Sequence, residues 1–439
     1  MAGVRREVTF QQLIDEGLLE IGDGYRAQNN ELGGTGPMFL RAGHVTDTYI
    51  DFTDVERFHE HLAEKVRSKM SHRGDTIITT KGNSTGRTSF VTDRLPPFVY
   101  SPHLSYWRSR NTETLCGGFL RYWSQGVEFT RQLSGMKAST DMAPYLSLTD
   151  QRRLKITLPT VAEQKAIAAV LGALDDKIEL NRHTNATLEA MARALFQSWF
   201  VDFDPVRAKL DDRQPIGLDD ATAALFPAAF HDSPLGPIPQ GWKAQPLPDA
   251  IEVNPRRTLK AGAIAPYLDM KNMPTQGHCA DEVVDREFSS GTKFQNGDTL
   301  LARITPCLEN GKTAFVDFLE AGQVGWGSTE YIVFAPKPPL PPQFTYLLAR
   351  SDSLRSHAIQ NMTGTSGRQR VPSECFGGLF VTAPTAEVAR RFDELTSPLM
   401  AKIKANTKQS RTLATLRDTL LPKLLAGELQ VDASEKVLK

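Results

Sequence analysis

The chain has 439 residues, and its 51 Lys plus Arg balance its 51 Asp plus Glu. This neutral balance argues against a protein that coats nucleic acid by charge alone, although it leaves room for local basic surfaces. Four scattered cysteines without C-x-x-C spacing argue against a zinc site and fit a reducing compartment. The opening MAGVRREVTF lacks an apolar signal region, and no run approaches the ~18 apolar residues of a membrane span. We therefore expect a cytoplasmic protein without a membrane partner.

Residues 1–157 are predicted to form a first globular domain. Within it, RGDTIITTKGNSTGRTSFV at 73–91 has the pattern of a turn, a β-type run, a polar loop and a second β-type run. Side chains in this loop, and in SGMKASTD further along, are of the kinds that hydrogen-bond to base edges and phosphates. The candidate DNA contacts of this domain are Lys81, Asn83, Ser84, Thr85, Arg87, Lys137, Ser139 and Thr140. Taken singly, each loop is more typical of an ordinary solvated turn than of a DNA contact.

A long helix is predicted over residues 158–201. Apolar residues recur there in alternating steps of four and three, which is the heptad pattern of a coiled coil. Pro159 and Thr160 supply a helix start. Two layers of the apolar seam are instead polar, Asn181 and Asn185. Polar residues in such a seam cost stability but fix register and partner, so we interpret them as register-setting positions.

Residues 202–241 are dense in proline, glycine and aspartate, a composition that predicts a connector rather than a core. A second globular domain is predicted over residues 242–383, where NGDTLLARITPCLENGKTAFV at 296–316 parallels the stretch at 73–91. The same argument as before selects two loops, of which GTSGRQR is the richer in base-reading side chains. The candidate DNA contacts of this domain are Arg303, Asn310, Lys312, Thr365, Ser366, Arg368, Gln369 and Arg370.

A second long helix is predicted over residues 384–429, followed by a polar tail at 430–439. It repeats the first helix at constant register over roughly forty residues, a length that chance does not explain. The polar layers recur too, because Asn406 and Ser410 fall at the positions of Asn181 and Asn185. We therefore predict an α+β fold with an internal repeat, in which the two helices pack on each other. Independent bundle helices whose polar residues face solvent are the alternative.

No catalytic centre is predicted. The loops at 81–88 and 306–313 lack the glycine and lysine spacing of a phosphate-binding loop. NPRR at 254–257 lacks the second proline and the aromatic residue of the amino-methyltransferase signature. His59 and His61 would point to different faces of a helix, so a solvated pair is favoured over a metal site. We expect no bound metal.

Three stretches resemble the specificity subunit of Type I restriction–modification systems. The first begins ITLPTVAEQKAIAAVLGALDDKIELN and covers residues 156–200. The second is LGPIPQGWKAQPLPD at 235–249, which resembles the entry into the second recognition domain of that family. The third combines FVTAPTAEVARRFDEL with LLPKLLAGEL at 420–429. The resemblance is specific in the helices and weaker inside the globular domains.

The resemblance implies two target recognition domains that each read one half of a bipartite site in double-stranded DNA. The two helices would form an antiparallel coiled coil with a pseudo-two-fold axis and hold the domains one DNA turn apart, roughly 34 Å. It also implies two methyltransferase (modification) subunits, which use S-adenosylmethionine for adenine N6 methylation, and restriction/translocase subunits driven by ATP and Mg. This chain itself would bind no cofactor.

We therefore predict a non-catalytic DNA-specificity subunit of a Type I restriction–modification complex. One rival is a single-chain methyltransferase or nuclease, which would need catalytic motifs that the sequence does not contain. The other is a coiled-coil scaffold whose globular ends bind protein and which does not recognise DNA sequence. Sequence-specific DNA retention in moderate salt separates this scaffold from the leading hypothesis.

Overall fold

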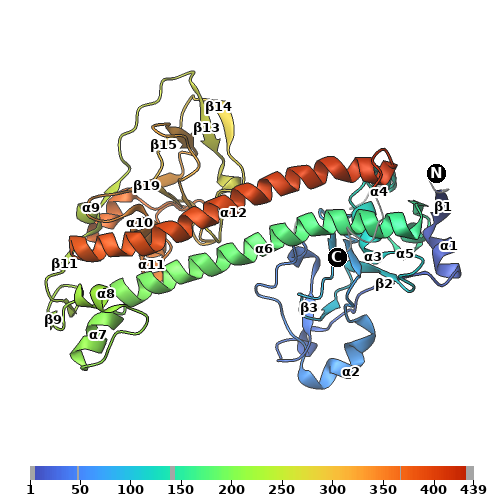
Figure 1. Ribbon diagram of the computed structural model, residues 1–439, viewed down its shortest axis with the longest axis horizontal. Coiled ribbons are helices and arrows are strands. Elements are labelled where there is room, and N and C mark those ends of the chain that lie inside the picture. Colours follow the sequence, from blue (N-terminus) through green and yellow to red (C-terminus); the bar gives the residue numbers. More distant parts are fainter. Residues whose placement is uncertain (1–4, 47–48, 139–143, 366, 432–439) are drawn as a thin grey trace. The chain divides into compact units, whose positions relative to one another are not determined.

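The computed structural model describes residues 5–46, 49–138, 144–365 and 367–431 (Figure 1). The chain divides into two compact units: residues 1–178 with 412–439, and residues 179–411. Each unit contains a stretch of both long helices, α6 (Val161–Phe200) and α12 (Ala386–Ala426). Both helices lie inside the ranges that the heptad pattern predicts.

The first unit is built around a four-stranded antiparallel sheet with the order β2-β7-β4-β5. Two smaller pairs accompany it, β1 antiparallel to β8 and β3 parallel to β6. The strands are β1 (Arg6–Thr9), β2 (Leu19–Asp23), β3 (Met38–Leu40), β4 (Thr76–Thr79), β5 (Thr88–Phe90), β6 (Phe98–Tyr100), β7 (Leu104–Ser109) and β8 (Lys155–Leu158). The helices are α1 (Phe10–Asp15), α2 (Ala63–Val66), α3 (Gly117–Trp123), α4 (Val127–Ala138) and α5 (Leu148–Arg152).

The core of the first unit is aromatic. Phe10 packs edge-on against Trp107 with ring centroids 5.0 Å apart, and Trp123 joins them. Leu171 of α6 and Leu424 of α12 are buried in the same cluster. The long helices are therefore part of this core, and burial of their apolar stripes contributes to its stability.

The second unit contains a four-stranded antiparallel sheet with the order β12-β19-β16-β17. This unit also contains a second four-stranded sheet, β14-β13-β18-β15, and two small strand pairs, β10 with β9 and β11 with β20. The strands are β9 (Phe230–His231), β10 (Ile238–Pro239), β11 (Lys243–Pro246), β12 (Ile251–Val253), β13 (Ile264–Leu268), β14 (Val284–Glu287), β15 (Thr292–Phe294), β16 (Thr299–Ala302), β17 (Thr313–Phe315), β18 (Gly325–Gly327), β19 (Tyr331–Pro336) and β20 (Phe380–Ala383). The helices are α7 (Asp204–Leu210), α8 (Asp220–Ala224), α9 (Leu247–Ala250), α10 (Pro342–Ala349) and α11 (Asp352–Gln360).

One turn recurs in both units. Gly74 and Gly297 precede the central strands β4 and β16 with φ of 90° and 91°, a conformation that glycine adopts without a steric cost. The following aspartates, Asp75 and Asp298, are buried. Each accepts a hydrogen bond of 2.8 Å from a backbone N–H three residues earlier, which closes the turn. The Gly-Asp pair that marks the β-type runs in the sequence thus has the same structural role twice.

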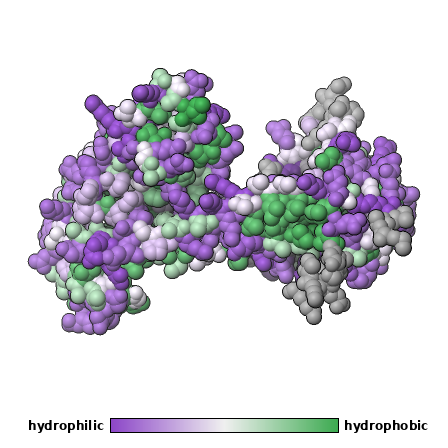
Figure 2. Space-filling view, turned by 45° about the horizontal axis from the view of Figure 1, so that its top comes forward, coloured by the Kyte–Doolittle hydropathy of each residue, from purple (hydrophilic) through white to green (hydrophobic). Residues whose placement is uncertain are grey.

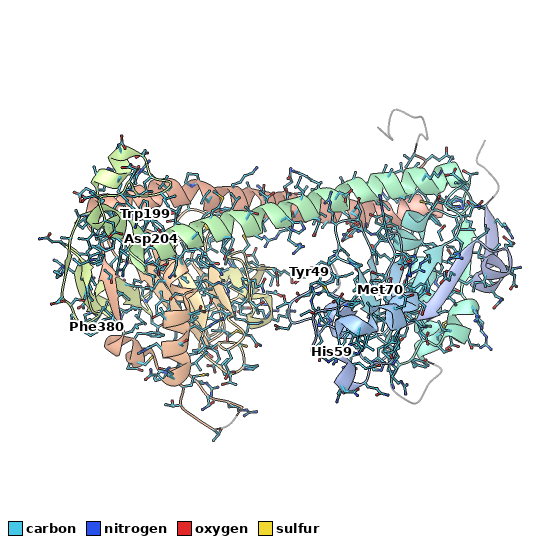
Figure 3. All side chains as sticks on the ribbon, turned by 90° about the horizontal axis from the view of Figure 1, so that it is seen from below. Tyr49, His59, Met70, Trp199, Asp204 and Phe380 are labelled. Atoms are coloured by element: carbon cyan, nitrogen blue, oxygen red, sulfur yellow. The ribbon has the colours of Figure 1, made fainter. Side chains whose placement is uncertain are left out.

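The segment at 202–241 differs from the connector that its composition predicts. It forms α7, α8 and the β9–β10 pair, and Phe203, Val206 and Phe226 are buried in the core of the second unit. Trp199 lies near the end of α6, as labelled in Figure 3, and packs edge-on against Phe226 with ring centroids 4.9 Å apart. The apolar side chains between the prolines find buried partners, so the segment belongs to the folded unit.

Within each unit, different groups join α6 to α12. In the first unit, Asp175 accepts a hydrogen bond of 2.8 Å from Arg417. In the second unit, Asn181 donates 2.9 Å to the Gln409 side chain and 3.2 Å to the Ser410 hydroxyl. One contact is ionic and the other is made by neutral amides and hydroxyls.

Candidate nucleic-acid interface

The loop between β4 and β5 carries five of the predicted DNA contacts of the first unit. Thr85 is buried, and its hydroxyl donates to the backbone oxygens of Gly82 at 2.7 Å and Pro144 at 3.0 Å. Arg87 donates to the Val45 oxygen at 3.0 Å. Both side chains therefore hold the loop in place, and neither is aimed freely at solvent.

The remaining candidates of the first unit fall into two groups. Lys81 and Asn83 are exposed, and Ser84 is half-buried. Lys137 lies on α4 and its side chain falls outside the described residues. Ser139 and Thr140 also lie outside that part of the chain. Among the described candidates of this unit, the side chains that a ligand can reach are therefore those of the loop at 81–84.

In the second unit, the two predicted loops lie side by side. The backbone N–H of Arg303 donates to the backbone oxygen of Glu330 at 3.0 Å, and the backbone oxygen of Arg303 accepts from the Val371 N–H at 2.9 Å. The Thr305 N–H donates to the Gln369 oxygen at 3.1 Å. The last two of these backbone bonds join residues that are more than sixty positions apart in the sequence.

The two arginines of GTSGRQR have different environments. Arg370 forms a bidentate ion pair with Glu330, with Nε and Nη2 at 2.9 and 2.7 Å from the same carboxylate oxygen. The hydrogen bond to Glu330 raises the pKa of Arg370. Arg368 is exposed and forms no ion pair within the described residues. Arg368 is thus free to reach a ligand, whereas Arg370 would first have to exchange Glu330 for it.

Two further candidates divide in the same way. Lys312 is directed inward, because its Nζ donates to the Met270 oxygen at 2.7 Å and the Lys271 oxygen at 3.3 Å. Asn310 is exposed. Thr365 is exposed as well, and its neighbour at position 366, the predicted candidate Ser366, lies outside the described residues.

A cavity of about 550 Å³ opens beside Arg303. We name it the basic cavity, because its lining includes three arginines and a lysine and no carboxylate. Its lining residues are Asn254, Pro255, Arg256, Arg257, Thr258, Gly291, Thr292, Lys293, Arg303, Thr329, Tyr331 and Val333. Three of its four cations are absent from the sequence prediction, which selected only Arg303.

The NPRR turn positions two of these arginines. Asn254 directly follows β12 and has a φ of 54°, a left-handed conformation that asparagine tolerates better than most residues. Its Oδ1 accepts a hydrogen bond of 3.0 Å from the Val333 N–H, which fixes the turn to β19. Pro255 follows, and Arg256 and Arg257 then line the cavity. The adjacent arginines were the available signal, but their closeness to Arg303 depends on tertiary contacts.

Arg257 also neutralises the buried Asp298, with Nη2 and Oδ1 2.9 Å apart. Burial raises the pKa of Asp298 despite this arginine. The Nε atoms of Arg257 and Arg303 are both buried without a hydrogen-bond partner in the described part of the chain. Buried donors of this kind are costly when they are left unsatisfied.

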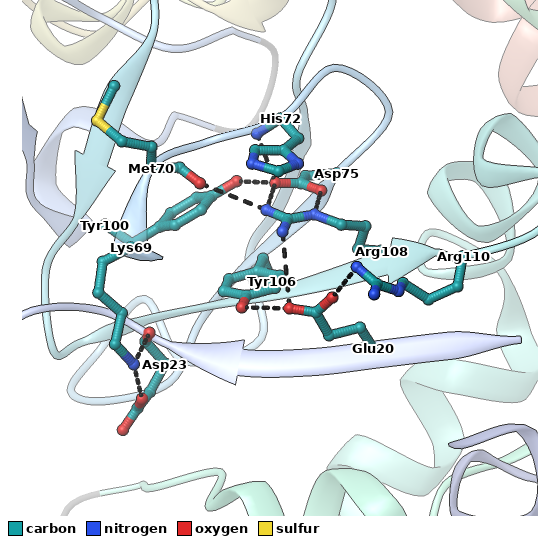
Figure 4. Close-up of polar contacts among 10 residues, drawn as sticks. All are labelled: Glu20, Asp23, Lys69, Met70, His72, Asp75, Tyr100, Tyr106, Arg108 and Arg110. Atoms are coloured by element: carbon teal, nitrogen blue, oxygen red, sulfur yellow. Dashed lines mark hydrogen bonds and ion pairs between the residues drawn. The ribbon is translucent and has the colours of Figure 1, made fainter. Parts of the chain in front are cut away.

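In the first unit, Asp75 is neutralised from inside the sheet (Figure 4). Arg108 on β7 donates through Nε at 2.7 Å and Nη2 at 2.8 Å, and the Tyr100 hydroxyl donates at 2.6 Å. Glu20 also lies 3.6 Å from Arg108 and accepts from the Tyr106 hydroxyl at 2.8 Å. This network is self-contained and offers no free cation.

The first unit has a cavity of a different kind, with a volume of about 680 Å³. Apolar side chains such as Phe119, Trp123, Val127 and Leu425 contribute to its lining. Figure 2 shows green, hydrophobic residues gathered on one part of a surface that is otherwise mostly purple. The lining also includes two cations, Arg5 and Lys423, and two carboxylates, Glu128 and Glu428, so this cavity has no excess of positive charge for a nucleic acid.

Two classes of site are not found in the described residues. No group of three or more His, Cys, Asp or Glu side chains could hold a metal ion there. No described helix is both long and apolar enough to cross a membrane.

The class of protein emerges from comparison with known families. Residues 28–190 match the family model of the Type I restriction modification DNA specificity domain. The match begins in the first unit and runs into α6. This part of the chain is therefore similar to the specificity domains of that class.

Particular relatives agree with the family model. The Type I restriction enzyme HindI specificity subunit of Haemophilus influenzae is 23% identical over 408 residues, which cover 82% of this chain and 88% of the relative. The MjaIX specificity subunit of Methanocaldococcus jannaschii is 24% identical over 318 residues, covering 70% of this chain and 66% of the relative. The resemblance to specificity subunits of Type I restriction–modification systems is thereby confirmed.

A solved structure supports the fold. The crystal structure of the S subunit of a Type-I restriction-modification system from M. genitalium has a TM-score of 0.53 and 15% sequence identity. The alignment covers 96% of each chain. At this identity the likeness establishes the mixed helix-and-strand architecture alone.

Proposed function

We propose that this chain is the DNA-specificity subunit of a Type I restriction–modification complex. It catalyses no reaction itself, but reads a bipartite site in double-stranded DNA and directs adenine N6 methylation and restriction by partner subunits. The observation that carries the proposal is the pairing of two polar loops in the second unit beside a cavity lined by cations. Arg and Gln side chains read base edges, while Arg, Lys and Thr reach phosphates.

The two units are proposed to be copies of one ancestral module, each reading one half-site. Their main sheets have equivalent strand orders, β2-β7-β4-β5 and β12-β19-β16-β17. Each sheet also has a Gly-Asp turn before its central strand, β4 or β16. The two helices are proposed to pack as an antiparallel coiled coil that acts as a ruler. In support, Asn181 contacts Ser410 while Asn185 contacts the earlier Asn406, so the partner runs in the opposite direction.

These polar contacts are proposed to set the helix register. Asn181 and Asn406 are buried, so any shift along the helices would leave their amides without partners. A fixed register gives a fixed distance between recognition modules, and hence a fixed gap between half-sites.

The partners follow from the family. We propose two methyltransferase subunits and restriction/translocase subunits in the cytoplasm, with S-adenosylmethionine, ATP and Mg bound by those partners and not by this chain. Five exposed polar residues and two half-buried ones, Ser84 and Gln369, are assigned to DNA contact. These are Lys81, Asn83, Ser84, Asn310, Thr365, Arg368 and Gln369.

The proposal is tested by co-expressing this chain with its methyltransferase subunit and mapping N6-methyladenine across a host genome. The expected result is a split motif with a constant gap, which disappears when this chain is omitted. Methylation that is unchanged without this chain would contradict the proposal and favour the coiled-coil scaffold.

Variants then assign the half-sites. Arg368→Ala is expected to relax base choice in one half of the motif by ~1–3 kcal/mol if the contact is bidentate. Asn83→Ala should act only on the other half, because it lies in the other unit. An equal loss of methylation at every sequence would instead make these residues phosphate contacts.

A further inference from the structure

The basic cavity has the chemistry of an anion site. Three of its four cations form no ion pair with a described carboxylate, and these are Arg256, Lys293 and Arg303. Asp298 pairs with Arg257, the fourth cation of the lining, and Glu330 pairs with Arg370, which lies outside the lining. The cavity therefore keeps a positive excess.

Hydrogen-bond donors accompany the charge. Thr258 and Thr329 bring exposed hydroxyls to the lining, and the buried Nε atoms of Arg257 and Arg303 have no partner among the described residues. A phosphate group accepts several hydrogen bonds at once and is best satisfied by guanidinium and hydroxyl donors. The donor set thus matches a phosphate better than a carbonyl or an amide.

The walls of the cavity are held rigidly. The Asn254 side chain ties the NPRR turn to β19. Gly291, at the start of β15, approaches the Gly327 oxygen so closely that a Cβ would lie 2.1 Å from it. Lys293 follows on β15, with its Nζ 5.1 Å from the centre of the Phe288 ring. Donors held in this way bind a ligand at a smaller entropic cost than mobile surface side chains.

The alternative ligand is an unstacked base, which the lining does not suit. Base pockets need an aromatic face on which the base stacks. Tyr331, the aromatic residue of the lining, is buried with 2% exposure, and its hydroxyl donates to the Leu268 oxygen at 3.1 Å. Its ring is therefore part of the core and offers little surface for stacking.

We propose that the basic cavity binds a phosphodiester of the DNA backbone and so anchors the second unit independently of sequence. The inference rests on the proposed function. Within this unit, the cavity would contribute affinity that is independent of sequence, while Arg368 and Gln369 on the neighbouring loop would determine base choice. Backbone contacts fix position on DNA, and base-edge contacts determine sequence.

The test measures binding of the full chain to a fluorescent DNA duplex by anisotropy between 50 and 300 mM KCl, on the order of the range where phosphate contacts dominate. Each lost phosphate contact should lower the slope of log affinity against log salt by about 0.9. We expect this change for Arg256→Ala and for Lys293→Gln, with the same loss on every duplex sequence. Arg256→Lys keeps the charge and should retain the slope.

Arg213→Ala is the matched control, because it removes one exposed arginine of the same unit that does not line the cavity. Arg257 is avoided, because its loss would leave Asp298 buried without a cation. An Arg256→Ala slope equal to that of Arg213→Ala would overturn the inference. A loss confined to certain sequences would also overturn it, since that result identifies a base contact.

A second readout separates failure of the inference from failure of the proposed function. Inorganic phosphate, compared with chloride at equal ionic strength, should raise the thermal midpoint of the wild type but not of Arg256→Ala or Lys293→Gln. Wild-type protein that binds no DNA would refute the proposed function and the DNA ligand together. DNA binding without any effect of phosphate or of these variants would refute the cavity alone.

Discussion

The two units bury an aspartate at the same Gly-Asp turn but neutralise it from different places. Asp75 receives two hydrogen bonds from Arg108 in the middle of the sheet and a third from Tyr100. Asp298 receives one from Arg257, which comes from the turn after β12 and also lines the basic cavity. The backbone turn is therefore the constant feature, and the source of the neutralising charge is free to vary.

This difference separates structure from binding. In the first unit the arginine is locked inside a network that also includes Glu20 and Tyr106. In the second unit the arginine stands at the edge of an open cavity, where one guanidinium can serve the core and a ligand.

Arg108→Met should lower the free energy of unfolding of the first unit by about 3–5 kcal/mol, because it leaves Asp75 fully buried without a cation. Urea unfolding, localised by hydrogen exchange, measures the loss. Arg110→Met is the control, since this arginine is 58% exposed and pairs with the same Glu20. Its effect should stay within about 1 kcal/mol. Equal losses in the two variants would show that the buried network does not stabilise the unit.

Arg257→Met should cost less, about 1–3 kcal/mol, because a single hydrogen bond is lost. Burial already raises the pKa of Asp298, so this carboxyl takes up a proton readily when its partner is removed. When a carboxyl has a higher pKa in the folded state than in the unfolded state, the free energy of unfolding falls as pH rises and the carboxyl ionises. The deficit relative to wild type should therefore grow from pH 4 to pH 8 (about the span over which the carboxyl ionises). A deficit that shrinks with pH would contradict this account.

Asn181→Ala should cost about 1 kcal/mol, since it removes amide hydrogen bonds to Gln409 and Ser410 in the helix pair of the second unit. Arg182→Ala on the exposed face provides the comparison and should be nearly neutral. Thermal unfolding of both variants measures the difference. If Arg182→Ala costs as much, the polar layer has no special role in stability.

The smallest effect concerns pH. The Lys65 ammonium, together with the Gln28 N–H, lowers the pKa of Glu31 from 4.5 to about 2. A lowered folded-state pKa adds stability that is complete above the unfolded value and is lost as pH falls toward 2. The difference in thermal midpoint between wild type and Glu31→Gln should therefore shrink as pH drops from 5 to 2 (about the interval between the two pKa values). A constant difference would show that the pair does not titrate in this interval.

Local patterns in the sequence predicted the local structure well. The heptad steps predicted α6 and α12, Pro159 and Thr160 predicted the start of α6, and the Gly-Asp pairs predicted the turns before β4 and β16. These features depend on residues close together in the chain. The packing of 202–241 escaped prediction, because proline and glycine content says nothing about the buried partners of Phe203 and Phe226.

The candidate interface was only partly predictable for the same reason. Arg368 and Asn83 are exposed, as a contact residue should be. Composition alone could not show that Glu330 forms an ion pair with Arg370, because 40 positions separate the two residues. The cations at 256, 257 and 293 join Arg303 only through the tertiary fold.

The division of the chain has a consequence for biosynthesis. The second unit is one continuous stretch, 179–411, whereas the first unit also needs 412–439. Leu421 and Leu424, from the last turns of α12, are buried in the same core cluster as Phe10 and Trp107. A ribosome adds about 5–20 residues per second, so the amino-terminal half waits tens of seconds for these leucines. The half that is synthesised first is therefore the half that completes its folding last.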